Sequence, residues 1–221
     1  MLGVIFDWDG VVINSANLHE KSWEILAEEL GFDLPHDHFV LGFGKRNETI
    51  IGKMLRWSED QVQIIKWGNR KEEIYRELGR VKGIPLIPGT ETLIRDLHEQ
   101  SVPMCIGTST ERKNIEMAIQ QNQLNGLFAG AVCSEDVIQG KPNPEVFLKA
   151  SDLIGIAPEN CIVFEDSTHG ISAAVNAKMI PVGITTTNSE EKLFDKGAKL
   201  VVERLDEINL SILKDLIKSG K

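Results

Sequence analysis

The sequence contains few cysteines and no long hydrophobic segment. The three cysteines, Cys105, Cys133 and Cys161, lie in separate apolar stretches and lack the Cys/His spacing of a metal site. We expect them to be reduced core residues, which favours a cytoplasmic protein. The longest apolar run, residues 126–133, is far shorter than the roughly 18 residues of a membrane helix. Membrane insertion is therefore not expected. Because no basic segment precedes the first apolar run, a signal peptide is not expected either.

The sequence also lacks an excess of positive charge. It has 24 Lys and Arg residues against 33 Asp and Glu residues, which gives a net charge of −9. A surface of that sign repels nucleic acids and anionic membranes, so we expect neither as a partner. An anionic small molecule can still bind where a local positive site receives it. The G-x-G-x-x-G pattern is missing after the first apolar segment, which disfavours a nucleotide-cofactor enzyme.

Apolar stretches and turn signals predict an α/β protein. Residues 3–8 form the first predicted strand, and a mainly helical pattern follows from Ser15 to about residue 82. Ser15 and Gly31 are typical residues for the start and the end of the first helix. After a Gly/Pro-rich linker at 83–89, short apolar strands alternate with helices. The later strands are predicted at 102–108, 129–134, 160–166, 180–185 and 199–202, and the later helices at 90–100, 111–122, 144–155 and 168–178.

This alternation is typical of a parallel sheet with helices on both faces. The helical block lies in the sequence between the first strand and all the others. We therefore predict a Rossmann-like parallel sheet core formed by residues 1–14 and 86–221, with an inserted α-helical cap domain at residues 15–85. Ligands of open α/β sheets bind at the carboxyl ends of the strands, so polar residues at those ends are candidate site residues.

Two of the predicted strands end in paired acids. Asp7 and Asp9 follow the first strand, and Glu165 and Asp166 end the strand at 160–166. Two carboxylates two residues apart on an extended segment point the same way and repel each other. If all four acids meet, an oxygen-preferring cation such as Mg²⁺ fits between them. The alternatives are a turn at Asp7 and helix capping by the second pair.

Hydroxyl and lysine side chains mark further candidate positions. Thr108 and Ser109 follow an apolar strand and begin a helix, where a hydroxyl and backbone N–H groups can bind an anion. A simple helix cap is the commoner use of such residues. Lys141 in "GKPNPE" lies between Gly140 and Pro142, which keep the backbone there out of a helix. Lys141 can reach inward as a fixed positive charge, or it can stay solvated like most single lysines.

These segments together resemble a known family. In their order and spacing, "DWDGVVINS", "CIGTST", "GKPNPE" and "VFEDSTHGISAA" are similar to the four motifs of the haloacid dehalogenase superfamily. The branch that they resemble contains β-phosphoglucomutase and small sugar-phosphate phosphatases, and the resemblance covers the whole chain. Each motif alone is weak, but the ordered set is highly specific.

The resemblance implies a role for each motif residue. Asp7 is the expected nucleophile that takes the phosphoryl group. Asp9 is the expected acid/base, which protonates the leaving oxygen and then activates water or an acceptor hydroxyl. Thr108 is expected to hold the transferring phosphoryl group, and Lys141 to offset charge and to steady Asp7.

The resemblance also implies a Mg²⁺ site. Its expected ligands are the Asp7 carboxylate, the Asp9 main-chain carbonyl and Asp166, with Glu165 assisting directly or through water. The physical chemistry agrees, because a phosphate dianion that approaches a carboxylate is repelled unless positive charges stabilise the transferring group.

The helical segment contains candidate substrate-binding residues. His19 shares a stripe with Trp23 and Leu26, so it suits a core position, but in the resemblance it stands where a cap histidine faces the active site. The segment "GFGKRNE" resembles a cap loop that supplies a substrate-contacting arginine, which corresponds to Arg46 with Lys45 beside it. Lys71 can also face the cleft, but a solvated helix face is the favoured interpretation.

Two residues depart from the family pattern. Residue 14 is Asn where many relatives have Asp. We expect this difference to affect the hinge motion of the cap and not the catalytic chemistry. Lys178 in "NAKMIPVGI" stands where relatives usually carry Gly, at the end of a helix. Because that position favours the left-handed conformation, we predict a positive φ at Lys178, at a cost of about 1 kcal/mol.

The sequence therefore predicts Mg²⁺-dependent hydrolysis of a small-molecule phosphate ester through an aspartyl-phosphate intermediate, with a monomer favoured. The main alternative is a mutase of the β-phosphoglucomutase type. A catalytically silent phosphate-binding protein is disfavoured, because binding alone does not need Asp9. Dehalogenase and phosphonate-cleaving activities are disfavoured by the second acid of "DWDG".

Overall fold

The chain forms two compact units in the computed structural model, which describes residues 2–42 and 44–219. Phe43 of the "GFGKRNE" segment and the ends of the predicted core domain lie outside the described residues. Met1–Asn14 and Leu86–Lys221 belong to one unit, which we call the sheet unit. Ser15–Pro85 belong to the other, which we call the helical unit.

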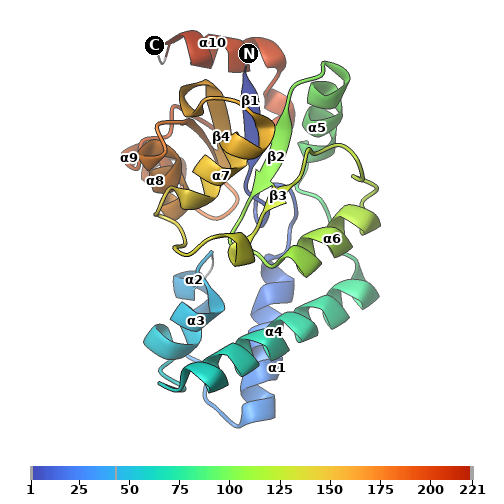
Figure 1. Ribbon diagram of the computed structural model, residues 1–221. Coiled ribbons are helices and arrows are strands. Elements are labelled where there is room, and N and C mark those ends of the chain that lie inside the picture. Colours follow the sequence, from blue (N-terminus) through green and yellow to red (C-terminus); the bar gives the residue numbers. More distant parts are fainter. Residues whose placement is uncertain (1, 43, 220–221) are drawn as a thin grey trace. The chain divides into compact units, whose positions relative to one another are not determined.

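The sheet unit is built on six parallel strands in the part of the chain that the structure describes. Their order is β3-β2-β1-β4-β5-β6 (Figure 1). The strands are β1 (Gly3–Phe6), β2 (Met104–Gly107), β3 (Ala131–Val132), β4 (Cys161–Glu165), β5 (Ile180–Ile184) and β6 (Leu200–Val202). The chain runs outward from β1 to β3 and then returns to the other side of β1 with β4, so its direction reverses between β1 and β4. This arrangement confirms the predicted α/β class with a Rossmann-like parallel sheet.

Helices cover both faces of this sheet. α7 packs on β1, β2 and β3, and α8 beside it packs on β4 and β5. α5 and α6 lie on the other side (Figure 1). The helices are α5 (Thr90–Glu99), α6 (Arg112–Gln121), α7 (Glu145–Ile154), α8 (Thr168–Asn176), α9 (Glu190–Asp195) and α10 (Leu210–Ser219), with 3₁₀ turns at η2 (Ser134–Asp136), η3 (Pro158–Asn160) and η4 (Leu205–Glu207). α9 and α10 were not predicted from the sequence.

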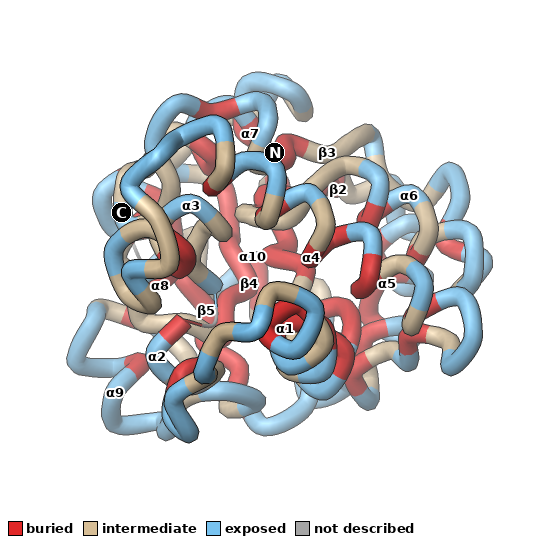
Figure 2. The backbone as a smooth tube through the Cα atoms, turned by 90° about the horizontal axis from the view of Figure 1, so that it is seen from below, coloured by how far each residue is buried: buried red, intermediate tan, exposed pale blue. Residues whose placement is uncertain are grey.

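The core of the sheet unit lies along the central strands. Every residue of β1, β2, β4 and β5 is buried, because a parallel sheet with helices on both faces has no solvent side. The Phe6 ring stacks on Phe164 of the neighbouring strand, with 5.1 Å between the ring centroids. The three cysteines are buried, as predicted. Figure 2 shows burial along the strands and exposure along the outer turns of helices and loops.

The helical unit has a core of its own. Its elements are α1 (Ala16–Leu30), α2 (His38–Gly42), α3 (Asn47–Thr49), a π-helical turn η1 (Ile50–Met54) and α4 (Gln61–Lys82). α1 and α4 pack against each other. Their apolar faces enclose one cluster of buried residues, which are Trp23, Leu26, Ile50, Ile51, Ile64 and Ile74. Among the described residues of the whole chain, no helix has the length and apolar character needed to cross a lipid bilayer.

The ends of α1 show one correct prediction and one wrong one. Gly31 ends the helix in the left-handed conformation, with φ of 69°. Ser15 precedes the helix as predicted, but its side chain makes no capping hydrogen bond. Its φ of −102° and ψ of −8° are close to helical values, whereas a capping serine has an extended backbone that turns its hydroxyl toward the first N–H groups.

Lys178 follows α8 with φ of 60°, which confirms the predicted left-handed conformation. Its N–H donates to the Val175 carbonyl and the N–H of Met179 donates to the Ala174 carbonyl, at 2.9 and 3.0 Å. These two bonds satisfy carbonyls at the helix end that would otherwise lack partners. The motif is therefore maintained by backbone hydrogen bonds, although its central residue has a Cβ atom.

Lys178→Gly should stabilise the protein by about 1 kcal/mol, because glycine adopts positive φ without the steric penalty of a Cβ atom. Thermal unfolding should show a Tm roughly 2–4 °C higher than that of the wild type. Lys214→Gly is the matched control, since Lys214 is exposed inside α10 and glycine there should destabilise by about 1 kcal/mol. A lower Tm for Lys178→Gly would contradict this account.

Candidate functional site

Three buried carboxylates meet where β1 and β4 end side by side. Phe6 of β1 pairs with Phe164 of β4, and the N–H of Asp7 donates to the Phe164 carbonyl at 3.0 Å. This pairing places Asp7 next to Glu165 and Asp166, and the three side chains can offer carboxylate oxygens that all lie within 4.8 Å of one another. The cluster lies at the point where the strand order reverses, which is the usual ligand position in open α/β sheets.

Lys141 supplies a positive charge inside this cluster. Its Nζ atom lies 2.8 Å from Asp7 Oδ1 and 2.6 Å from Glu165 Oε1, and 4.8 Å from the centroid of the Phe147 ring. Its side chain is only 4% exposed, so it is not a solvated loop lysine. Although burial alone lowers the pKa of an ammonium group, the Asp7 and Glu165 carboxylates raise the pKa of Lys141 above its ordinary value. Lys141 therefore stays charged.

One ammonium group does not balance three carboxylates. Burial raises the pKa of Asp7 to about 7, with Glu165 and Asp9 adding to the rise and Lys141 opposing it. Burial also raises the pKa of Asp166, helped by the charges of Glu165 and Asp7. Because the pKa values of Asp7 and Asp166 are raised, a further cation nearby would favour the ionised form of both carboxylates. A compact set of hard oxygen ligands suits Mg²⁺.

Glu165 is fixed by hydrogen bonds to both of its carboxylate oxygens. Oε1 accepts from Lys141, and Oε2 accepts from the backbone N–H of Ser167 at 3.0 Å and from its hydroxyl at 2.9 Å. The Ser167 hydroxyl also accepts from the Gly170 N–H and so caps α8. A Cβ atom at Gly170 would lie 1.8 Å from the Glu165 carboxyl, so only glycine fits there. Glu165 is therefore well placed to hold Lys141.

The loop after β2 contacts Asp9. The backbone N–H of Thr108 donates to the Val132 carbonyl at 2.9 Å, and its hydroxyl accepts from the N–H of Thr110 at 3.1 Å. The Thr110 hydroxyl donates to the Asp9 carboxylate. Thr108 is buried, whereas Ser109 is half-buried. The structure thus brings Asp9 to the loop that contains Thr108 and Ser109.

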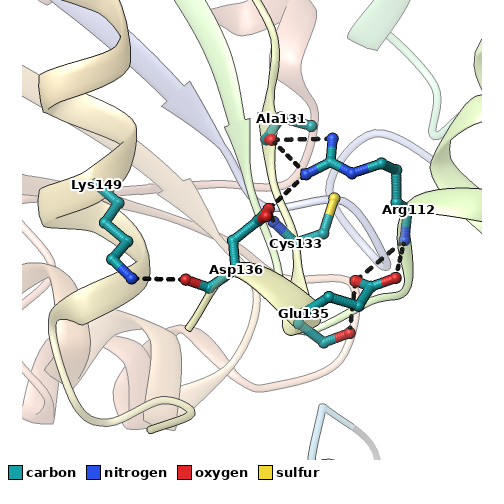
Figure 3. Close-up of polar contacts among 7 residues, drawn as sticks. Arg112, Ala131, Cys133, Glu135, Asp136 and Lys149 are labelled. Carbon is teal, nitrogen blue, oxygen red and sulfur yellow. Dashed lines mark hydrogen bonds and ion pairs between the residues drawn. The ribbon is translucent and has the colours of Figure 1, made fainter. Parts of the chain in front are cut away.

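A polar network connects Arg112, Asp136 and Lys149 (Figure 3). Asp136 Oδ2 accepts from the Arg112 guanidinium at 2.5 Å and from the Cys133 N–H at 2.7 Å. The Asp136 carbonyl accepts from Lys149 of α7 at 2.6 Å. These bonds tie the start of α6 to η2 and α7.

The helical unit contains a second buried group of polar side chains. Lys71 Nζ lies 2.8 Å from Glu72 Oε1 and 2.6 Å from His19 Nδ1, and Asn47 Nδ2 donates to Glu72 Oε1 at 2.8 Å. His19 stacks on Tyr75 with 4.1 Å between ring centroids. The interpretation of Lys71 as a solvated residue is wrong, since it is 2% exposed. Its acidic partner and neighbouring aromatic rings make this burial possible.

Lys45 and Arg46 are half-buried in the same unit. Lys45 Nζ lies 3.8 Å from the Met54 sulfur. Arg46 precedes α3 with an extended backbone, and its carbonyl accepts the N–H groups of Thr49 and Ile50. These contacts anchor the backbone of the basic pair, and a substrate-binding role for His19, Lys45 and Arg46 stays a prediction.

Comparison with known proteins identifies the family. The sequence matches the model of the haloacid dehalogenase-like hydrolases over residues 4–184. The chain belongs to this family. The resemblance found in the four motifs is thereby confirmed.

Similar proteins include phosphatases. A chloroplastic 5-amino-6-(5-phospho-D-ribitylamino)uracil phosphatase from Arabidopsis thaliana is 37% identical over 219 residues, which are 97% of this chain and 57% of the relative. A probable pseudouridine-5'-phosphatase from Drosophila melanogaster is 31% identical over 181 residues, which are 79% of this chain and 78% of the relative. A solved haloacid dehalogenase hydrolase of family IA, variant 3, from Entamoeba histolytica has a TM-score of 0.89 and 31% identity, covering 99% of this chain and 100% of that one. The predicted enzyme class, a phosphatase of this superfamily, agrees with these names.

Two hydroxyl residues that contact the acids of this haloacid dehalogenase-like hydrolase were not predicted from the sequence. Ser167 and Thr110 bind Glu165 and Asp9. Ser167 directly follows the second acid pair and begins a helix, a signal that could have identified it. Thr110 lies at the end of the motif "CIGTST", but nothing in the sequence shows that its hydroxyl meets Asp9 rather than solvent.

Glu72→Gln should destabilise the helical unit, because it leaves the buried Lys71 ammonium without its carboxylate. Breaking a buried ion pair in this way costs about 3–5 kcal/mol. Although burial alone raises the pKa of Glu72, Lys71 lowers it from 4.5 to about 2 in the folded protein. This contribution to stability is therefore complete above pH 4.5 and disappears as the pH falls toward 2.

Urea unfolding at pH 7 and pH 3, followed by tryptophan fluorescence, measures both effects. Glu73→Gln is the matched control. The Glu73 carboxylate is exposed and lies 3.4 Å from the Arg70 guanidinium, and such exposed pairs contribute about 0–1 kcal/mol. The wild type should lose more stability than Glu72→Gln between the two pH values. Equal losses in all three proteins would show that the Lys71–Glu72 pair does not stabilise the fold.

Proposed function

We propose that this protein is a Mg²⁺-dependent phosphomonoester hydrolase that acts on a small organic phosphate through an aspartyl-phosphate at Asp7. The observation that carries this proposal is the buried cluster of Asp7, Glu165 and Asp166 around the Lys141 ammonium, in a chain of this family. Catalytic roles for Asp7, Asp9, Thr108 and Lys141 come from the motif resemblance. The geometry of the cluster is consistent with them.

The Asp7 and Asp166 carboxylates and the Asp9 main-chain carbonyl are the proposed Mg²⁺ ligands. Glu165 already accepts hydrogen bonds at both oxygens, which favours its assisting through water or through Lys141. When bound, Mg²⁺ stabilises the negative charge that develops on the transferring phosphoryl group. The Lys141 ammonium, which lies 2.8 Å from Asp7 Oδ1, would stabilise the same charge, and Thr108 is proposed to hold the phosphoryl oxygens.

In the first step, a carboxylate oxygen of Asp7 attacks the phosphorus atom, and the bond from phosphorus to the leaving oxygen breaks. Asp9 donates its proton to that oxygen, so the product leaves as an alcohol. The hydrogen bond from Thr110 holds the Asp9 carboxyl group in the loop that follows β2. The phosphoryl group is then covalently attached to Asp7.

In the second step, water attacks the phosphorus atom of the aspartyl-phosphate. Asp9, now ionised, accepts a proton from that water, and the bond between phosphorus and Asp7 breaks. Inorganic phosphate leaves and both aspartates return to their first state. Asp9 therefore serves as acid and then as base, a task that phosphate binding alone does not require.

The substrate is proposed to be a small phosphorylated metabolite, as the names of the related phosphatases suggest. The net charge of −9 makes a large anionic partner such as nucleic acid unfavourable. We propose that His19, Lys45 and Arg46 of the helical unit contact the part of the substrate that leaves. A cytoplasmic location and a monomeric state remain the expectations for this activity.

Asp7→Asn should lose turnover by about four orders of magnitude or more, because the amide is a poor nucleophile and a poor Mg²⁺ ligand. The fold should remain intact, since Lys141 keeps its ion pair with Glu165. The measurement is phosphate release across a panel of phosphate esters, with Mg²⁺ and with EDTA. Asp152→Asn makes the same chemical change on the exposed face of α7 and should keep wild-type turnover. Near-normal hydrolysis by Asp7→Asn would rule out the proposed nucleophile.

The enzyme should act as a hydrolase rather than a mutase. A mutase must exclude water from the aspartyl-phosphate while its bisphosphate intermediate turns around in the site. It must also bind a second phosphate group, for which Lys45 and Arg46 are the candidate residues. The test incubates the protein and Mg²⁺ with β-glucose 1-phosphate and a trace of the 1,6-bisphosphate. Inorganic phosphate should appear without glucose 6-phosphate. Rapid formation of glucose 6-phosphate with little free phosphate would reverse this assignment.

A further inference from the structure

The loop that follows β5 donates side-chain hydrogen bonds to Asp166. The Thr187 hydroxyl donates to Asp166 Oδ2, and Asn188 Nδ2 donates to the Asp166 carbonyl at 3.0 Å. The Thr186 hydroxyl lies 3.4 Å from the same Oδ2 atom and donates to the Gly10 carbonyl at 2.5 Å. Three consecutive residues of one loop therefore contact Asp166, and one of them also binds the segment that follows Asp9.

These contacts enclose one of the two carboxylate oxygens of Asp166. A Cβ atom at Gly10 would lie 2.0 Å from Oδ2, so the Gly10 backbone packs directly against that oxygen. Asp166 itself is 1% exposed. Within the described residues, Oδ1 accepts no hydrogen bond. With Oδ2 held by Thr187 and Gly10, the carboxylate plane is fixed and Oδ1 is the oxygen left to bind a cation.

Packing of the hydrophobic core does not explain this arrangement. Thr186 and Thr187 are both exposed residues, so their side chains add little to the hydrophobic core. Their hydroxyls nonetheless point to a buried carboxylate and to a backbone carbonyl next to the acid pair. Hydrogen bonds to a metal-binding carboxylate typically orient it, and losing one weakens metal affinity about 10–100-fold.

We propose that Thr187 is a positioning residue that orients the Asp166 carboxylate for Mg²⁺, with Thr186 and Asn188 holding the loop in place. This inference rests on the proposed function, because it takes Asp166 as a Mg²⁺ ligand. It adds a part of the site that the four motifs do not contain, since Thr187 lies after β5, beyond the last motif.

The test measures Mg²⁺ binding by calorimetry on the full chain without substrate. Thr187→Val removes the hydroxyl and keeps the side-chain shape, and it should weaken Mg²⁺ affinity about 10-fold or more. Thr187→Ser keeps the hydroxyl and should bind Mg²⁺ within about 3-fold of the wild type. Thr185→Val is the matched control on the same loop, and it should bind like the wild type because the Thr185 hydroxyl contacts neither Asp166 nor Gly10 in the described structure. Thermal unfolding without Mg²⁺ should show that all four proteins are folded at the temperature of the calorimetry.

Wild-type affinity in Thr187→Val would overturn the inference, and so would equal weakening in Thr185→Val. If the wild type does not bind Mg²⁺, both this inference and the proposed function are wrong. If the wild type binds Mg²⁺ and Thr187→Val binds it more weakly, but no phosphate ester is hydrolysed, the inference stands and the proposed function fails. Weaker Mg²⁺ binding by Thr187→Val, together with near-wild-type binding by Thr187→Ser, supports the inference that Thr187 orients Asp166.

Discussion

The contact on which the site depends is the Lys141 ammonium between Asp7 and Glu165. It connects the loop before α7 with the ends of β1 and β4, and both distances are below 3 Å. Without this charge, the neighbouring carboxylates would repel one another in a buried position, where solvent screens them poorly. The sheet can therefore end two adjacent strands in acids because a third segment supplies a buried cation.

Hydroxyl groups hold the other acids around this contact. Ser167 binds Glu165, Thr110 binds Asp9 and Thr187 binds Asp166. The three hydroxyls come from the loops that follow β4, β2 and β5. Asp7 and Glu165 share the ammonium of Lys141, which lies 2.8 Å from Asp7 Oδ1 and 2.6 Å from Glu165 Oε1.

The helical unit also contains a buried lysine, but its charge is balanced differently. Its buried Lys71 is paired with Glu72, the next residue along α4, and lies near the Trp23 and Tyr75 rings. Such a pair contributes less net stability than apolar residues of the same size, yet it fixes the positions of His19 and Asn47.

The sequence by itself determined the class of fold, because apolar strands that alternate with helices leave few arrangements other than a parallel sheet. It also determined the family, through four ordered motifs, and the left-handed conformation at Lys178, where the helix must end. It did not show the burial of Lys71, since a single lysine in a helix has no pattern that distinguishes a core position from a solvated one. Tertiary structure alone decided which hydroxyl meets which acid. Thr110 lies 101 positions from Asp9, and Thr187 lies 21 positions from Asp166. Local propensity does not encode such pairs, because they exist only once the strand order brings the loop ends together.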